Sequence, residues 1–272
     1  MVYIGKAQIS IIIPVLNSPL IDQTLVSLQR QRFDLDRVEI IIVGLLDSEP
    51  YARSSAVKMQ FIEADVSVGE ARNLGIEASS GKWLVFLDSD CICSEQWLTK
   101  LTEHLIEGWP VVGGGVSAYG GSFYATCYNI ATFHEFLDIL PPGPRNYLPT
   151  LNLTMWREVA EKVGPMDREL PRSEDIEWTV RIKKQGYPLY FEPRATVFHC
   201  PPTNLRRVLT KWFNTGYCSR TVRQRHPAQL ETHWLLNSPA ILLGISPLIG
   251  LIATFRIFCR HPGLLKFFYT FP

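Results

Sequence analysis

The last third of this 272-residue sequence contains almost no acidic residues. No Asp or Glu occurs between Glu192 and Glu231, and none follows Glu231. The first of these intervals contains the cations Arg194, Arg206, Arg207, Lys211, Arg220, Arg223 and Arg225. The formal net charge is nevertheless only +1, because the first two thirds are acidic by compensation. This total predicts no nucleic-acid partner.

The sequence also has no paired cysteine framework, and we expect no secretory leader. The six cysteines are scattered, and Cys91-x-Cys93 has neither the spacing of a zinc site nor a second pair. We therefore expect reduced thiols in a cytosolic compartment. The first apolar run, 9–16, is short, contains Pro14 and lacks a small-residue cleavage site. It predicts a first strand rather than a signal peptide.

Short apolar runs alternate with helical patterns over the first ninety residues. Strands are expected at 8–15, 38–43, 57–62 and 82–87, and helices at 20–33 and 69–79. This alternation predicts a doubly wound parallel sheet with right-handed crossovers.

The remaining elements are less regular. Helices are expected at 94–107 with Ser94 as cap, at 122–140, from about 172 to 186 with Ser173 as cap, and at 203–225. Strands are expected at 187–191 and 195–199. The cluster 141–144 contains three prolines and a glycine, and is either a rigid corner or a mobile loop.

Two carboxylates follow the buried strand 82–87. Asp88 and Asp90 are two residues apart, so they share one side of an extended chain, at the strand end where ligands of open α/β sheets bind. Neighbouring carboxylates repel each other unless a cation or proton lies between them, and their oxygens suit Mg²⁺ or Mn²⁺. The simpler interpretation is a solvated turn.

Two further candidates have equally plausible structural explanations. Glu174, Asp175 and Glu177 stand in a first helical turn, where the helix dipole stabilises acids. His199 ends an expected strand, and a lone histidine there is more often structural than a ligand.

Five sequence blocks resemble, in order and spacing, the signatures of family 2 glycosyltransferases of the GT-A fold. They are Ile9–Asn17 (ISIIIPVLN), Gly69–Gly75 (GEARNLG), Phe86–Asp90 (FLDSD), Val163–Asp167 (VGPMD) and Ser173–Asp175 (SED). The match spans about residues 8–216. It implies an α/β, Rossmann-like domain over 1–226 with a mostly parallel central sheet flanked by helices.

The resemblance implies an inverting transfer of a sugar from a nucleoside-diphosphate donor to a hydroxyl acceptor on a glycan, a lipid-linked molecule or a small molecule. By position, Asp175 resembles the catalytic base, with Glu174 beside it. Asp90 would bind Mn²⁺ or Mg²⁺ within a DXD motif, with Asp88 against the ribose or the metal and His199 as a third ligand. The positions implied on the donor side are Pro14, Asn17, Asp47, Arg72, Asp88, Ser89 and Asn152.

Chemistry agrees with this allocation. A bound cation stabilises the charge that develops on a diphosphate leaving group. The acceptor hydroxyl has a pKa far above neutral, so a carboxylate must accept its proton as the new bond forms.

Two departures from the family pattern matter. Most relatives end the second strand in an Asp-Asp-Gly-Ser type of turn whose acid reads the base, whereas Gly44 stands here and Asp47 would have to substitute from a longer loop. Processive members carry Gln-x-x-Arg-Trp, but this chain has Val208-Leu209-Thr210-Lys211-Trp212. The second departure favours a single transfer over polymerisation.

The apolar C-terminal helical segment, 227–272, forms a second predicted unit. No formal charge occurs from 232 to 255, which is long enough for a bilayer span, although prolines and glycines interrupt it. A re-entrant hairpin and a buried helix pair are the alternatives. Because the preceding helix is basic, we expect membrane association at the cytoplasmic face, with a soluble cytoplasmic protein as the alternative.

Two other functions compete with the glycosyltransferase hypothesis. A sugar-nucleotide pyrophosphorylase would need a glycine-rich phosphate loop after the first strand, which Asn17-Ser18-Pro19-Leu20 does not provide. A non-catalytic nucleotide-sugar-binding or scaffold protein derived from such an enzyme is compatible with the departure at Gly44.

Overall fold

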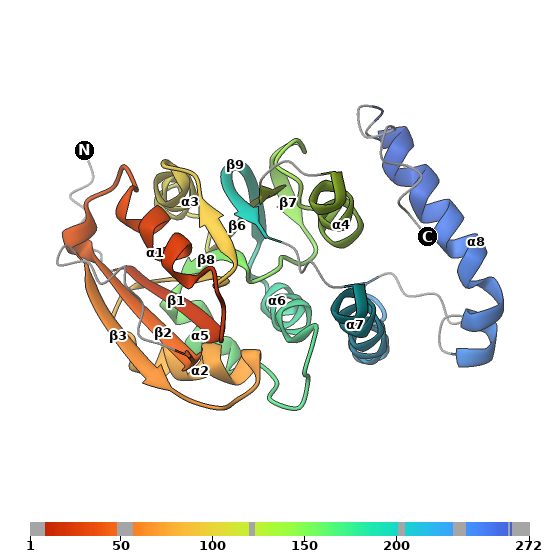
Figure 1. The fold of residues 1–272 in the computed structure, drawn as a ribbon, viewed down its shortest axis with the longest axis horizontal. Helices are drawn as coiled ribbons and strands as arrows, with labels where there is room; N and C mark the ends of the chain where they lie inside the picture. Colours follow the sequence, from red (N-terminus) through yellow and green to blue (C-terminus); the bar gives the residue numbers. More distant parts are fainter. Residues whose placement is uncertain are drawn as a thin grey trace.

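The computed structural model describes residues 9–47, 57–119, 123–200, 205–230, 238–260 and 262. Its strands are β1 (Ile9–Leu16), β2 (Val38–Leu45), β3 (Lys58–Glu63), β4 (Trp83–Leu87), β5 (Cys91–Cys93), β6 (Val111–Ala118), β7 (Gly143–Arg145), β8 (Asn152–Trp156) and β9 (Leu189–His199). They form one twisted sheet in the order β3-β2-β1-β4-β8-β6-β9-β5, with β7 also paired to β9 (Figure 1).

The helices are α1 (Ile21–Gln29), α2 (Val68–Ala78), α3 (Trp97–Ile106), α4 (Phe123–Phe133), α5 (Arg157–Val163), α6 (Glu174–Lys184), α7 (Leu205–Arg225) and α8 (Pro239–Arg260), with a 3₁₀ turn η1 (Leu35–Arg37). Successive side chains of β2 point alternately to the two faces of the sheet and pack into different apolar clusters. Ile41 and Val43 pack on Ala71 of α2, whereas Ile40 and Ile42 join the main core. Burial on both faces explains why these strands are continuously apolar.

The sheet is mixed rather than mostly parallel. The pairs β3-β2, β2-β1, β1-β4 and β6-β9 are parallel. The expected doubly wound arrangement therefore holds for the β3-to-β4 half. Beyond β4 it fails, because β8 lies antiparallel between β4 and β6. The two expected strands near 187–199 form one strand, β9, with a register shift opposite Gly114 and Val116.

Several helix ends also differ from expectation. The helix expected at 94–107 begins at Trp97, and its cap position is Gln96 rather than Ser94. The helix expected at 122–140 ends at Phe133. Ser173 does occupy the cap position of α6, but its side chain makes no cap hydrogen bond. The corner at 141–144 contains the start of β7, which pairs with β9.

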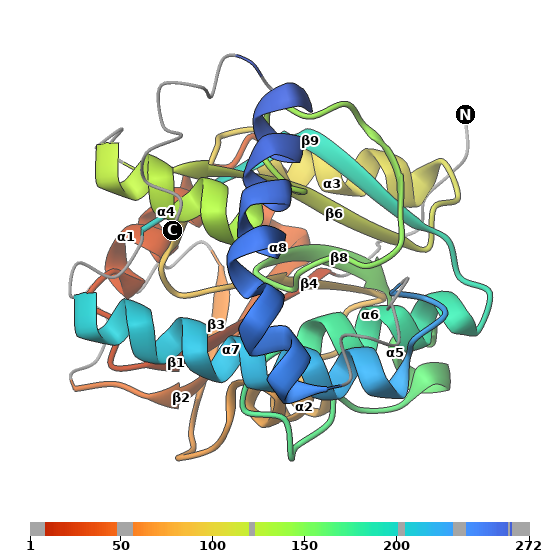
Figure 2. The ribbon, with the colours of Figure 1, turned by 90° about the vertical axis from the view of Figure 1, so that its right-hand side faces the viewer.

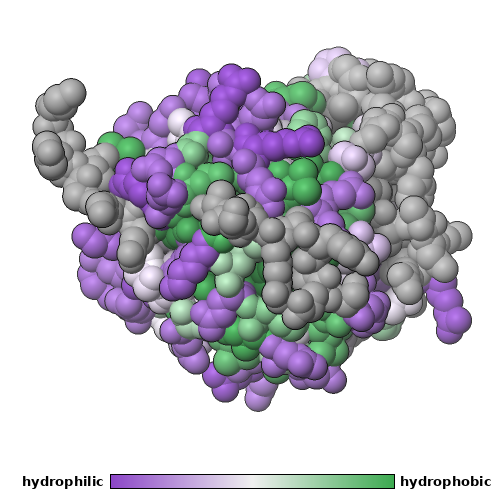
Figure 3. Space-filling model, turned by 60° about the vertical axis from the view of Figure 1, so that its left-hand side comes forward, coloured by the Kyte–Doolittle hydropathy of each residue, from purple (hydrophilic) through white to green (hydrophobic). Residues whose placement is uncertain are grey.

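Helix α8 is the outermost element at one end of the molecule, beyond α4 and α7 (Figures 1 and 2). It includes Pro247. Among the residues that the structure describes, no helix combines the length and apolar character needed to cross a bilayer. The bilayer span considered for 232–255 is therefore not observed, and residues 232–237 of that range lie outside the described part. The opposite, β3 end presents intermixed hydrophilic and hydrophobic residues (Figure 3).

A buried carboxylate joins the N-terminal ends of the first strands. Glu39 of β2 accepts hydrogen bonds from the Ser10 hydroxyl (2.7 Å) and from the Ser80 backbone N–H (2.6 Å) and hydroxyl (2.8 Å). The Ser10 hydroxyl in turn accepts the Gly81 N–H. Although burial opposes ionisation, these bonds lower the pKa of Glu39 to about 2. The carboxylate thus fixes the entry to β4.

We predict that Glu39→Gln lowers the free energy of unfolding at pH 7 by about 2–3 kcal/mol, since the lowered pKa marks a preference for the ionised form in the folded state. The stabilisation exists above the unfolded pKa of about 4.5 and is lost as pH falls towards 2. Denaturant unfolding at pH 7 and pH 3 tests this. Glu77→Gln, at an exposed position, is the matched control. An equal effect of both substitutions at pH 7 would contradict the prediction.

Candidate functional site

The turn after β4 presents two acids at the carboxyl end of the parallel strands. The Asp88 N–H donates to Leu151 O, and the Cys200 N–H donates to Asp90 O. The hydroxyls of Ser18 and Thr24 both donate to Ser89 O. Ser89 is thus buried and held through its backbone, while the side chains of Asp88 and Asp90 remain about one third exposed.

Arg72 connects this turn to the start of α6. Its Nη2 donates to Asp88 Oδ1 and its Nη1 donates to Glu174 Oε1, both at 2.7 Å. The guanidinium is almost completely buried, and its Nε has no partner among the described residues. Gly69, one turn earlier in α2, makes room for this approach, because a Cβ there would lie 3.1 Å from Glu174 Cγ.

Asp175 lies beside Glu174 and opens towards the cavity. Its Oδ1 accepts the Ile176 N–H at 2.8 Å, and its Oδ2 accepts the Thr150 N–H at 3.4 Å. Burial raises the pKa of Asp175, although Arg72 opposes the shift. Burial, together with the neighbouring charge of Asp175, raises the pKa of Glu174 to about 7. Both acids therefore bind protons more strongly than exposed carboxylates.

The conformation of Ser173 turns the chain into α6. Its φ of 61° lies in the left-handed region, and its hydroxyl pairs with the Ser219 hydroxyl of α7 at 3.0 Å. The side chain expected to cap α6 therefore joins that helix to α7.

His199 and Asp90 form the arrangement that most closely fits a metal site. Asn129 donates to the carbonyls of Ser117 and His199, which leaves its Oδ1 to accept the His199 Nδ1–H at 2.8 Å. Burial lowers the pKa of His199, so the ring is neutral and Nε2 carries a lone pair. This nitrogen lies 3.7 Å from Asp90 Oδ2, and a cation between these two atoms would remove their repulsion.

The protein groups alone form an incomplete coordination shell. No cluster of three His, Cys, Asp or Glu side chains capable of holding a metal occurs in the described part of the chain. Asp88, the third predicted ligand, already pairs with Arg72 through Oδ1. A Mg²⁺ or Mn²⁺ ion commonly takes one or two carboxylates and completes its shell with substrate phosphates and water, so the residues present fit that mode.

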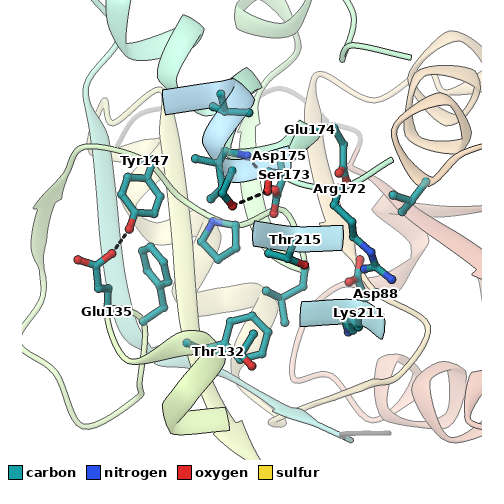
Figure 4. Close-up of a pocket in the computed structure, with 18 of the residues that line it drawn as sticks. Asp88, Thr132, Glu135, Tyr147, Arg172, Ser173, Glu174, Asp175, Lys211 and Thr215 are labelled. Carbon is teal, nitrogen blue, oxygen red and sulfur yellow. Dashed lines mark hydrogen bonds between the residues drawn. The ribbon is translucent and has the colours of Figure 1, made fainter. Parts of the chain in front are cut away.

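The acidic turn and the start of α6 share one cavity of about 390 Å³, lined by Asp88, Glu174, Asp175 and His199 among others. Figure 4 shows Asp88 and Lys211 on one side of it and the bonded pair Tyr147 and Glu135 on the other. Asp88 of the β4 turn and Asp175 of α6 therefore face a common space, which His199 also lines, whereas Asp90 is not among the residues that line it.

Other predicted donor contacts have different surroundings. Pro14 is buried in β1 and Asn17 is exposed with a φ of 44°. Asn152 is completely buried, accepts from Trp97 Nε1 and donates to the carbonyls of Gly115 and Ala195. Its amide thus holds strands together, and this arrangement gives no support to a contact with the donor sugar.

The departure at Gly44 has a structural cause. Its φ is +139°, and a Cβ would lie 1.8 Å from the Val15 carbonyl oxygen. No side chain fits there, so position 44 cannot supply an acid. Asp47 is exposed in the segment after β2.

Sequence reasoning missed the contribution of α7 to the cavity. Lys211, Thr215, Ser219 and Arg223 all line it. They are four residues apart and therefore lie along one face of the helix. This regular spacing of polar side chains was the sequence pattern that could have predicted a helix face lining the site. The segment that supplies Glu135, Phe136 and Tyr147 carried no comparable pattern.

Comparisons with known proteins agree with this geometry. The family model described as glycosyl transferase family 2 matches residues 51–163. Glycosyltransferase AglE of Haloferax volcanii is 31% identical over 224 residues, covering 76% of this chain and 71% of that protein. The pre-mycofactocin glycosyltransferase of Mycobacterium tuberculosis is 27% identical over 166 residues, but the chain covers only 35% of its length.

Solved structures show the same fold. S. aureus TarS 1–349 in complex with UDP-GlcNAc has a TM-score of 0.58 at 15% identity, over 72% of this chain and 59% of that one. A longer S. aureus TarS structure also has a TM-score of 0.58, at 14% identity. This match covers 71% of the present chain and 37% of the TarS chain. The sequence match over most of a related enzyme, the family model and the shared cavity together show that the chain belongs to the family 2 glycosyltransferases, with a GT-A-like fold.

Proposed function

We propose that the protein transfers a single sugar from a nucleoside-diphosphate sugar to an acceptor hydroxyl, with inversion at the anomeric carbon. The observation that carries this proposal is the ion-pair bridge of Arg72, which ties Asp88 to Glu174 at one cavity. A donor diphosphate beside the β4 turn and an acceptor beside α6 would then meet between separate acidic centres.

Asp175 is the proposed base. Its raised pKa suits proton abstraction better than that of an exposed acid, and its two backbone donors orient the carboxylate. The acceptor oxygen bonds to the anomeric carbon, the bond from that carbon to the diphosphate oxygen breaks, and the hydroxyl proton passes to Asp175. Glu174, held by Arg72, positions its neighbour.

Asp90 and His199 would hold Mn²⁺ or Mg²⁺, with Asp88 nearby. When bound, the ion would stabilise the negative charge on the departing diphosphate. Lys211 adds a cation at the same cavity: its Nζ lies 5.8 Å from the centre of the Tyr128 ring, which stacks on His199.

The proposed donor is a UDP-sugar or a related nucleoside-diphosphate sugar, because TarS, which has a similar fold, has been solved in complex with UDP-GlcNAc and with UDP. Pro14, Asn17, Asp47 and Ser89 stay predicted contacts on this side. Since Gly44 offers no side chain, backbone groups near the ends of β1 and β2 would read the base, assisted by Asp47. We further propose that the chain works at a membrane surface rather than across it.

The test is donor turnover. Purified protein with Mn²⁺ or Mg²⁺ is supplied with UDP-, GDP- and dTDP-sugars and hydroxyl acceptors, and nucleoside diphosphate is measured. Release that depends on an acceptor supports the proposal. Saturable donor binding without release in any combination would favour the binding or scaffold alternative.

We predict that Asp175→Asn lowers kcat by about 10²–10⁴-fold, because the amide cannot accept the hydroxyl proton. Donor affinity, measured by calorimetry, should change less than threefold. Asp36→Asn, at an exposed position in η1, is the matched control and should retain full activity. Wild-type turnover in Asp175→Asn would show that the base is another group.

Asp90→Asn should act on donor binding instead. With Mn²⁺ present, we expect the donor Kd to rise at least tenfold, since one metal-binding oxygen is lost. With chelator present, the variant and the wild type should bind the donor equally weakly. A loss of affinity that is the same with and without Mn²⁺ would contradict the assignment of Asp90.

The pH dependence provides a third test. The pKa values of Glu174 and Asp175 are both raised, and Asp175 must be deprotonated to act as the base. As the pH is lowered, kcat/KM should therefore begin to fall at a pH clearly above about 4, the value at which exposed carboxyls titrate. Arg72→Gln should move this limb to higher pH, whereas Arg72→Lys, which keeps the cation, should move it less. An acidic limb near 4 in all three proteins would contradict the assignment.

A further inference from the structure

The outer face of α7 exposes large apolar side chains in a regular stripe. Phe213 and Tyr217 are 77% and 70% exposed, and Leu209 is 55% exposed. These residues are four apart and therefore lie one above another on one side of the helix. Soluble surfaces seldom present aromatic residues so openly in a row, so this stripe is a candidate contact surface.

Helix α8 carries a second apolar stripe. Leu248, Leu251, Ile252 and Phe255 follow the i, i+3, i+4, i+7 spacing of one helical face and are 44–70% exposed. The buried Ile257 lies on the opposite side of the helix. Figures 1 and 2 agree that α8 is outermost at the end of the molecule where α7 lies. Two exposed apolar stripes therefore occur on neighbouring outer helices.

Within α7 and α8 the charge has one sign. Arg206 precedes Leu209 by three residues and Arg220 follows Tyr217 by three, so cations stand at both ends of the α7 stripe on the same face. Between Pro239 and Phe255 the sequence contains no charged residue, and Arg256 and Arg260 follow. Exposed aromatic and aliphatic groups on helices whose charged residues are all cations match an anionic lipid surface.

We propose that the outer faces of α7 and α8, namely Arg206, Leu209, Phe213, Tyr217 and Arg220 with the α8 stripe, dock on the surface of an anionic lipid bilayer. The proposal names the partner for the membrane-surface location proposed above. Neither helix has to cross the bilayer, in agreement with the absence of a spanning helix among the described residues.

A second copy of the chain is a poorer occupant. In a symmetric dimer the same patch meets itself, so the cations of one α7 would face those of the other. Like charges brought together in this way oppose association, whereas lipid phosphates neutralise them. The charge distribution therefore favours lipid.

Docking there would have a consequence for the active site. The face of α7 opposite the stripe lines the cavity through Lys211, Thr215 and Ser219. On the proposed bilayer the cavity would therefore lie directly behind the helix that contacts the lipid, and an acceptor anchored in the bilayer would approach it past α7. This last step rests on the proposed function, but the docking surface itself can be tested without any transfer reaction.

The test is binding of the full chain to vesicles by co-sedimentation. Vesicles of neutral phosphatidylcholine are compared with vesicles containing 30% phosphatidylserine. We expect Phe213→Ser/Tyr217→Ser to weaken binding to the anionic vesicles at least tenfold, because two large apolar groups no longer enter the interface. Arg206→Gln should weaken it about fivefold, and should leave binding to neutral vesicles unchanged.

Phe61→Ser is the matched control, since Phe61 is an exposed aromatic residue of β3 at the opposite end of the molecule. Donor affinity should be the same in all these variants and the wild type, which separates this test from that of the catalytic proposal. Equal binding of the double variant and the wild type would overturn the inference. So would a discrete dimer, seen by light scattering, that Phe213→Ser/Tyr217→Ser dissociates.

Discussion

The buried guanidinium of Arg72 is the interaction on which the site depends. It comes from α2, and it holds Asp88 after β4 and Glu174 at the start of α6, two positions 86 residues apart in sequence. Removing one partner of a buried ion pair costs on the order of 3–5 kcal/mol, because the remaining charge is uncompensated. The same loss would also change the shape of the cavity, since these bonds set the separation between Asp88 and Glu174, which both line it.

The mixed sheet explains how Asp88 and His199 come to one cavity. The parallel half ends at β4 and delivers Asp88 and Asp90 at its carboxyl edge. Beyond it, β6 and β9 are parallel, and β9 ends at His199 beside Asp90. The antiparallel β8 joins the two halves, and Leu151, just before it, accepts the Asp88 N–H. A sheet built only from crossovers would have left no strand of this direction between β4 and β6.

The features that the sequence predicted are those set by local patterns, and the features it missed depend on contacts between residues far apart in the chain. The strands β1 to β4 and their parallel direction were predictable, because burial on both faces imposes continuous apolar runs such as Ile9–Val15. The acids, Arg72 and His199 were found through family motifs, and they do meet. The antiparallel place of β8, the role of Asn152 in the core and the left-handed Ser173 depend on long-range contacts that local patterns do not encode. The pairing of Ser173 with α7 replaces the local cap that the sequence favours.

Helix α7 has two faces with different surroundings. Its polar residues at intervals of four line the cavity, and Trp212 stacks on Tyr128, which stacks on His199. The exposed stripe lies on the other side of the same helix. A helix moves as a nearly rigid rod, so any partner that shifts the outer face also shifts Lys211 relative to Asp88. Under the proposals above, acceptor delivery and diphosphate stabilisation would be mechanically linked through one element, and substitutions in α7 should be judged by both faces together.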